Sequence, residues 1–297
     1  MTFVIARSVD DALAALAAGA RPIAGGSDLV VGARHGAFAL PTDLVAIDRI
    51  RELGEVTVTH NGLQIGAGVT HARLMVEETI VGSYTSLADA AALVGSPATR
   101  NVGTLGGNVM NGSPAMDTGA PLVVMGASVT LKSKGASRDV PVRELWSGPG
   151  QTTAAGNELC TSINLPPTAP NSGSAYVRLE YRRAMEIAVV GAAASVTLSL
   201  DGLVTAAAVA LTAVAPTIIS VDLELGGSKV DDETFASVAA AASAQAAPIS
   251  DLRASDSYRR HTVGVMARRA FEAAARRARG ETIGVPVNRS LGIGASA

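Results

Sequence analysis

The chain has 297 residues, and its 24 Lys and Arg residues against 26 Asp and Glu residues leave a formal net charge of −2. With an aromatic content of 3%, it has neither the basic surface nor the stacking side chains that nucleic-acid binding requires, so we expect no nucleic-acid partner. Cys160 is the only cysteine and the four histidines are scattered along the chain, so we predict no metal site; this length predicts two or three domains.

The sequence predicts a cytoplasmic protein without a transmembrane segment. Residues 1–10 contain no basic stretch followed by an apolar run, which a secretory signal would need. The uncharged stretch 202–221 is as long as a membrane span, but it is rich in alanine and threonine and contains Pro216. We therefore interpret it as a buried strand and its turn.

Residues 1–54 predict a small first lobe built around a glycine-rich loop. A helix is predicted at 9–18, and strands are predicted at 21–24 and 44–48. Two adjacent glycines remove side chains where a backbone must approach a ligand closely, and they leave N–H groups that can point at phosphate oxygens. The loop with this property is Ala24-Gly25-Gly26-Ser27-Asp28.

Residues 55–168 predict a second lobe that begins with a β-hairpin. Strands 56–60 and 63–66 alternate around an Asn61-Gly62 turn. Gly66-Ala67-Gly68 follows this hairpin rather than a strand that feeds a helix, so we reject a Rossmann dinucleotide site there. Later in the lobe, the pattern predicts a helix at 87–94 and strands at 128–131 and 159–165.

A second glycine-rich loop is predicted at 103–112, and it contains Thr104-Leu105-Gly106-Gly107-Asn108. Thr104 and Asn108 can hydrogen-bond a phosphate or a sugar, and Asp117, nine residues beyond Asn108, can accept hydrogen bonds from sugar hydroxyls. A single glycine cluster is explained by tight turns or bulges. Two clusters in separate lobes favour one shared ligand with a diphosphate group.

A C-terminal α+β domain is predicted at 175–280, after a linker at 168–174 and before a tail at 281–297. Its pattern predicts two strands and then two helices, at 189–200, 203–213, 231–247 and 255–279. The last helix carries three arginine pairs, which we interpret as a solvated face, with a partner interface as the alternative. The pairs are Arg259-Arg260, Arg268-Arg269 and Arg276-Arg277.

Six segments of the chain, in their order and spacing, resemble the FAD-binding medium subunit of the xanthine dehydrogenase and carbon monoxide dehydrogenase family of molybdenum hydroxylases. The resemblance covers nearly the whole chain. The segments are AGGSDL at 24–29, IGAGVT at 65–70, RNVGTLGGN at 100–108, SPAMD at 113–117, RRAMEIA at 182–188, and DLRAS at 251–255 with YRR at 258–260.

The resemblance implies a two-lobed FAD-binding domain that is PCMH/VAO-like and non-Rossmann, followed by the C-terminal α+β domain. It implies no catalytic side chain and no metal ligand on this chain. Three of the implied FAD contacts have an equally good structural explanation, namely strand pairing for Thr161, a surface charge for Arg178 and core packing for Ile187. The full implied set is Ala24, Gly25, Gly26, Ser27, Asp28, Thr104, Leu105, Gly106, Gly107, Asn108, Asp117, Thr161, Arg178 and Ile187.

The resemblance also implies an electron-transfer role. A large partner subunit would hydroxylate a substrate at a molybdenum cofactor, a small partner would carry two [2Fe–2S] clusters, and FAD on this chain would pass the electrons to an external acceptor. The expected assembly is a dimer of heterotrimers, with the partners as separate polypeptides. The substrate and the acceptor stay open, although Cys160 alone disfavours the branch with an additional iron–sulfur cluster in this subunit.

Two alternatives remain at this point. One is a self-sufficient FAD-dependent oxidase or reductase with a similar flavin domain, in which His35, the histidine nearest the first loop, would be the candidate for a covalent flavin link. The other is a flavin-free assembly scaffold, which would have no reason to keep both glycine-rich loops.

Overall fold

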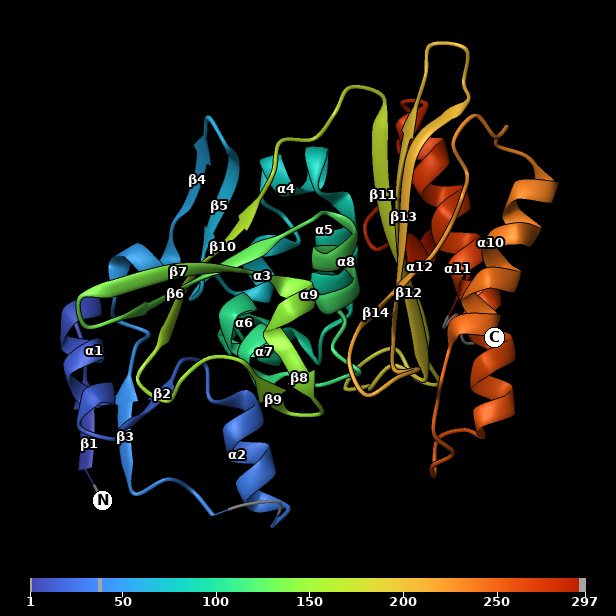
Figure 1. Ribbon diagram of the computed structural model, residues 1–297. Coiled ribbons are helices and arrows are strands. Elements are labelled where there is room, and N and C mark those ends of the chain that lie inside the picture. Colours follow the sequence, from blue (N-terminus) through green and yellow to red (C-terminus); the bar gives the residue numbers. More distant parts are fainter. Residues whose placement is uncertain (1, 37–38, 294–297) are drawn as a thin grey trace.

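The computed structural model describes residues 2–36 and 39–293, and it begins with a small lobe around a parallel sheet (Figure 1). The strand order is β1-β3-β2, so β3, the last of these strands in the sequence, lies between β1 and β2 and is parallel to both. Ser8 caps α1, because its hydroxyl accepts a hydrogen bond from the N–H of Asp11. The elements are β1 (Thr2–Ile5), α1 (Val9–Ala17), β2 (Arg21–Ile23), α2 (Ser27–Arg34) and β3 (Asp43–Ala46).

The second lobe contains a five-stranded antiparallel sheet in the order β4-β5-β10-β6-β7. The predicted hairpin is present as β4 and β5, which rules out a Rossmann unit at Gly66 to Gly68. Its strands are β4 (Val56–Thr59), β5 (Gly62–Gly66), β6 (Ser128–Ser133), β7 (Ala136–Pro141) and β10 (Leu159–Leu165), and a separate ribbon pairs β8 (Trp146–Gly148) with β9 (Gln151–Thr152).

Short helices fill the space between this sheet and the rest of the molecule. One of them contradicts the sequence analysis, because the predicted loop at 103–112 is mostly helix α7. The helices are η1 (Arg51–Gly54), α3 (His71–Leu74), α4 (Glu78–Ser83), α5 (Thr85–Leu93), α6 (Pro97–Val102), α7 (Leu105–Asn111), α8 (Gly119–Val124) and α9 (Val142–Leu145).

A four-stranded antiparallel sheet, in the order β11-β12-β13-β14, forms the C-terminal part with three helices. Strand β11 begins inside the segment predicted as a linker, and the segment assigned to a tail contains a helix. The elements are β11 (Ser172–Leu179), β12 (Val190–Leu198), β13 (Val204–Thr212), β14 (Ile219–Val221), α10 (Asp232–Gln245), α11 (Asp256–Ala278) and α12 (Val287–Ser290).

Both faces of the C-terminal sheet are buried, as Figure 1 shows: α10 and α11 cover one face, and α5 and α8 lie on the other. Alternate residues of the strands therefore belong to different cores. Tyr176 packs with the second lobe, whereas its neighbours Ala175 and Val177 pack with α11. The uncharged stretch 202–221 forms β13, which is buried from Val209 to Thr212 but exposed at Thr205 and Ala206, and the short strand β14. Within the described part of the chain, none of the helices combines the length and the apolar character of a membrane span.

The free edge of β11 is closed by side chains rather than by another strand. The N–H of Tyr176 donates to a carboxylate oxygen of Asp89 at 3.2 Å, and the N–H of Arg178 donates to Oδ1 of Asn288 at 3.1 Å. Asp89 also accepts hydrogen bonds from Arg277 and from the N–H of Val287. This covering satisfies the edge of the sheet and joins α5, α11 and α12.

The arginines of α11 do not all lie on a solvated face, so that interpretation is wrong for two of them. Arg259 is 2% exposed, and it donates to the carbonyl oxygens of Val189 and Ala213 and to Asp251. The side chain of Arg277 is 7% exposed in its ion pair with Asp89. Both arginines therefore make buried polar contacts that connect elements of the fold.

We expect Asp89→Ala to lower the free energy of unfolding by about 4 kcal/mol, because it leaves the buried guanidinium of Arg277 and two N–H groups without their acceptor. Asp232→Ala is the matched control, since the Asp232–Arg268 pair is exposed, and it should cost less than about 1 kcal/mol. Urea denaturation of both variants measures the difference, and equal losses would contradict this role of Asp89.

Candidate functional site

The first glycine-rich loop leads into an uncapped helix. Gly26 is the N-cap of α2 with φ 68°, a left-handed conformation that glycine adopts without strain. No side-chain hydrogen bond caps this helix. The N–H groups of its first turn, which have no partner inside a helix, are therefore available to an anion.

The second loop is organised differently. Thr104 is the N-cap of α7, and its hydroxyl accepts a hydrogen bond from the N–H of Gly107 at 3.1 Å. The N–H of Gly106 donates to the carbonyl of Ala67 at 2.9 Å. The expectation that both glycine N–H groups are free for phosphate is therefore wrong. What this segment offers is the exposed surface at Gly107 and the half-buried side chain of Asn108, together with the hydroxyl of Thr104, which is only 8% exposed and already accepts from Gly107.

The two loops touch each other. A Cβ atom on Gly25 would lie 1.8 Å from the carbonyl oxygen of Val102, and one on Gly103 would lie 3.6 Å from Oγ of Ser27. A Cβ atom on Gly106 would lie 2.7 Å from the carbonyl oxygen of Ala67. At Gly25 and Gly106, glycine is thus required by the protein's own backbone rather than by a ligand.

His71 lies against Gly103, beside the contact between the loops. Its N–H donates to the carbonyl of Gly103 at 3.1 Å, and a Cβ atom on Gly103 would lie 3.3 Å from Cδ2 of its ring. The side chain is 2% exposed, and its Nδ1 has no hydrogen-bond partner among the described residues. Burial, reinforced by the charge of Arg100, lowers the pKa of His71 to about 4. The imidazole is therefore neutral near pH 7.

Thr161 connects to the second loop through the backbone. It is the residue at which the pairing of β10 with β6 shifts register, which is a β-bulge. Its carbonyl accepts a hydrogen bond from the N–H of Ala67 at 3.0 Å, and the carbonyl of Ala67 in turn holds Gly106. The bulge at Thr161 thus positions Ala67, the residue on which the first turn of α7 is held.

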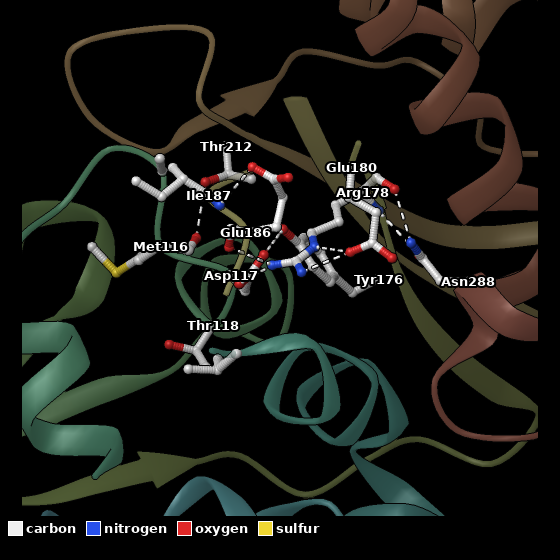
Figure 2. Close-up of polar contacts among 12 residues, drawn as sticks. Met116, Asp117, Thr118, Tyr176, Arg178, Glu180, Glu186, Ile187, Thr212 and Asn288 are labelled. Carbon is white, nitrogen blue, oxygen red and sulfur yellow. Dashed lines mark hydrogen bonds and ion pairs between the residues drawn. The ribbon is translucent and has the colours of Figure 1, made fainter. Parts of the chain in front are cut away.

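Asp117 lies between the second loop and the C-terminal sheet (Figure 2). Its Oδ1 accepts a hydrogen bond from the hydroxyl of Tyr176 and its Oδ2 accepts one from Nη1 of Arg178, both at 2.8 Å. The next residue, Thr118, donates through its hydroxyl to Oδ1 of Asn108 at 2.6 Å. Asp117 is therefore linked to Asn108 through the backbone and the hydroxyl of its neighbour Thr118.

Arg178 is fully buried, so the alternative that it is a surface charge is wrong. Its Nε donates to Glu180 at 2.7 Å, and its Nη1 also reaches the carbonyl of Glu186 at 3.4 Å (Figure 2). The two carboxylates keep the pKa of Arg178 above its usual range although burial acts in the opposite direction. In this conformation the connection of Arg178 to the glycine-rich loops runs through its hydrogen bond to Asp117.

Ile187 is 55% exposed, so the alternative of core packing is wrong for this residue. Its N–H donates to Oε1 of Glu186 at 3.2 Å, and the carbonyl of Glu186 is held by Arg178. The side chain is thus an exposed apolar group on a segment that is tied to the Asp117 cluster.

The structure also reveals two contacts near the predicted residues that the sequence analysis did not name, those of Tyr176 with Asp117 and of His71 with Gly103. Tyr176 was not predicted because β11 was not predicted; a strand through this segment would have placed Tyr176 and Arg178 on one face. His71 is one of the four histidines from whose scatter we predicted no metal site, and no pattern in the sequence reveals its contact with Gly103. Among the described residues, no group of three or more His, Cys, Asp or Glu side chains is arranged to hold a metal ion.

The chain is similar in sequence and in fold to known proteins. A family described as "FAD binding domain in molybdopterin dehydrogenase" matches residues 1–168, and one described as "CO dehydrogenase flavoprotein C-terminal domain" matches residues 174–274. The carbon monoxide dehydrogenase medium chain of Afipia carboxidovorans is 32% identical over 92% of this chain and 96% of that relative. A putative xanthine dehydrogenase FAD-binding subunit of Escherichia coli is 28% identical over 88% of this chain and 91% of that relative.

A solved structure of carbon monoxide dehydrogenase from Hydrogenophaga pseudoflava superposes with a TM-score of 0.87 at 30% identity, over 92% of this chain and 96% of that one. The predicted fold class, an α+β arrangement with a FAD-binding domain and a C-terminal domain, is confirmed.

We expect His71 to make the protein less stable in mild acid. Because the pKa of His71 in the folded protein lies below its ordinary value of 6.5, the unfolded chain binds the proton more readily, and stability is lost as the pH falls below that value. Between about pH 7 and about pH 5, the wild type should lose about 2 kcal/mol more than His71→Gln.

Urea denaturation at the two pH values measures this loss. The exposed His60 supplies the control, since His60→Gln should keep the pH dependence of the wild type. A wild type and a His71→Gln variant with the same pH dependence would show that His71 is not held neutral by burial.

Proposed function

Because this chain belongs to the FAD-binding medium subunits of molybdenum hydroxylases of the carbon monoxide dehydrogenase and xanthine dehydrogenase type, we propose that it holds FAD where its two glycine-rich loops meet and passes electrons to an external acceptor. The observation that carries the proposal is the contact between Gly25 and Val102, which brings the uncapped N-terminus of α2 beside α7.

The residues at this contact fit a diphosphate-containing cofactor. The first turn of α2 has free N–H groups and the positive end of the helix dipole, both of which favour phosphate. Thr104 and Asn108 add a hydroxyl and an amide from the other side, and Asp117 provides a carboxylate that accepts hydrogen bonds from hydroxyl groups. In this proposal Ala24 to Asp28 and Thr104 to Asn108 form the two walls, and Asp117 and Ile187 lie beside them. Arg178 acts through Asp117, and Thr161 acts through the backbone of Ala67.

The chain binds and orients, while the redox chemistry belongs to the cofactor. FAD, when bound, accepts electrons and releases them to an acceptor. The side chains described above hold phosphate, accept hydroxyl hydrogen bonds and, at Ile187, present an apolar surface for a flat ring. We assign no general acid, base or nucleophile to this chain.

The partner assignments are also part of the proposal. We place the substrate at a molybdenum cofactor in a large subunit, two [2Fe–2S] clusters in a small subunit, and this chain between them and the acceptor, in a cytoplasmic dimer of heterotrimers. Support comes from the relatives, which include the carbon monoxide dehydrogenase medium chain of Afipia carboxidovorans and the glyceraldehyde dehydrogenase medium chain of Sulfolobus acidocaldarius. Co-purification of the chain from its native host measures the partners and their stoichiometry.

We expect the purified chain to take up one FAD with flavin absorption bands, and Gly107→Val to weaken FAD binding by about tenfold or more. Gly107 is exposed, and a Cβ atom there would approach only Thr104 within 4 Å, at 2.9 Å. The larger side chain would therefore project into the space proposed for the diphosphate and displace the cap of α7. Titration with FAD, followed by flavin fluorescence, measures the affinity.

Gly82→Val is the matched control, because Gly82 is an exposed helical glycine in α4 with no atom within 4 Å of an added Cβ. It should leave FAD affinity unchanged. A wild-type chain that takes up no FAD would overturn the proposal, as would equal affinities of the two variants. Mass spectrometry of the denatured chain addresses the self-sufficient oxidase, because a flavin adduct on His35 would favour that alternative.

A further inference from the structure

We propose that Tyr176 and Arg178 of the C-terminal sheet are positioning residues for the cofactor, which act by fixing the carboxylate of Asp117 as an acceptor for hydroxyl groups of FAD. The inference rests on the proposed function, because it assumes that the cofactor lies beside Asp117. It gives the C-terminal sheet a part in cofactor binding that neither glycine-rich loop can supply.

The first step of the argument is that Asp117 is held from two directions by one strand. Tyr176 and Arg178 are two residues apart on β11, so their side chains leave the same face of the sheet. The hydroxyl of Tyr176 donates a hydrogen bond to Oδ1 of Asp117, and the guanidinium of Arg178 donates one to Oδ2, each at 2.8 Å. A carboxylate with a partner on each oxygen cannot rotate, and its remaining lone pairs point in fixed directions.

The second step is that neither positioning residue can touch a ligand itself. Tyr176 and Arg178 are both 0% exposed, whereas the side chain of Asp117 retains 9% exposure. Burial and the neighbouring Asp117 raise the pKa of Tyr176 well above its usual range, so the phenol stays protonated and donates. Any effect of these residues on the cofactor must therefore pass through Asp117.

The third step is that the sheet is shaped around this contact. Gly191 on β12 pairs with Arg178 on β11, and a Cβ atom on Gly191 would lie 2.5 Å from the hydroxyl of Tyr176. Thr212 on β13 holds the loop that carries Asp117, because its hydroxyl lies 2.9 Å from the carbonyl oxygens of both Pro114 and Met116. Three neighbouring strands thus contribute to the position of one carboxylate.

The fourth step is that the same cluster is connected both to α7 and to the segment that carries Ile187. Thr118, next to Asp117, donates to Asn108 on α7, and Arg178 holds the carbonyl of Glu186 beside Ile187. A carboxylate that turns when Tyr176 is removed would therefore misalign with α7 on one side and with the Ile187 segment on the other. Loss of the phenol hydroxyl should weaken FAD binding without removing any group that contacts FAD.

The test is a double-mutant cycle on FAD affinity in the full chain, with Tyr176→Phe, Asp117→Ala and the double variant. We expect Tyr176→Phe to weaken FAD binding about tenfold and to have no further effect in the Asp117→Ala background, because it acts through that carboxylate. The matched control is Tyr84→Phe, which removes another buried hydroxyl, bonded to the carbonyl of Pro166 at 2.9 Å. Tyr84→Phe should leave FAD affinity unchanged.

The outcomes separate this inference from the proposed function. A wild type that fails to bind FAD ends both. A wild type that binds FAD, with Tyr176→Phe unchanged or additive with Asp117→Ala, overturns only the positioning role. If Tyr176→Phe does not fold, Arg178→Lys replaces it in the same cycle, since lysine keeps the charge but lacks the fork that reaches Asp117 and Glu180 together; additivity there overturns the inference equally.

Discussion

The closure of the free edge of β11 is the contact on which the rest of the structure depends. An edge strand presents unpaired N–H groups, and here Asp89 and Asn288 accept from those of Tyr176 and Arg178. Because Asp89 also pairs with Arg277, a single buried carboxylate joins the second lobe to α11. This contact fixes the sheet at the distance at which its side chains reach Asp117, so the domain junction and the proposed cofactor site are set by the same strand.

Buried charge in this protein specifies geometry more than it adds stability. A guanidinium between two carboxylates carries a large desolvation cost, and an apolar replacement of similar size is often as stable. The same desolvation cost applies to the cluster of Arg178, Asp117 and Glu180, whose side chains are 0%, 9% and 4% exposed. The ionic cluster defines one orientation of Asp117, which an apolar cluster could not do, and this is the property that a pre-organised binding site needs.

The glycines of the two loops show that a glycine motif can be required by the packing of the protein's own backbone. The sequence analysis assigned all of them to close approach by a ligand. In the structure, Gly25 and Gly106 make room for the backbone at Val102 and Ala67, and only Gly107 lies at an open surface. Gly25 is needed because the first lobe touches the second at Val102, and Gly106 is needed because α7 packs on the segment at Ala67 within the second lobe. A cofactor held at such a contact would in turn stabilise the junction of the lobes, since it would bind both.

The sequence by itself determined the local elements and the family. Examples are the hairpin around Asn61-Gly62, the strands on either side of Asp201-Gly202 and the two long C-terminal helices. Alternation, turn residues and caps specify these elements, and each of these signals acts within a few residues. Only the tertiary structure decided that α7 replaces a loop, that Arg178 and Arg259 are buried, and that the hydroxyl of Tyr176 donates a hydrogen bond to Asp117. These outcomes depend on contacts between residues tens of positions apart, and no local pattern records whether a charge will meet its partner across a domain junction.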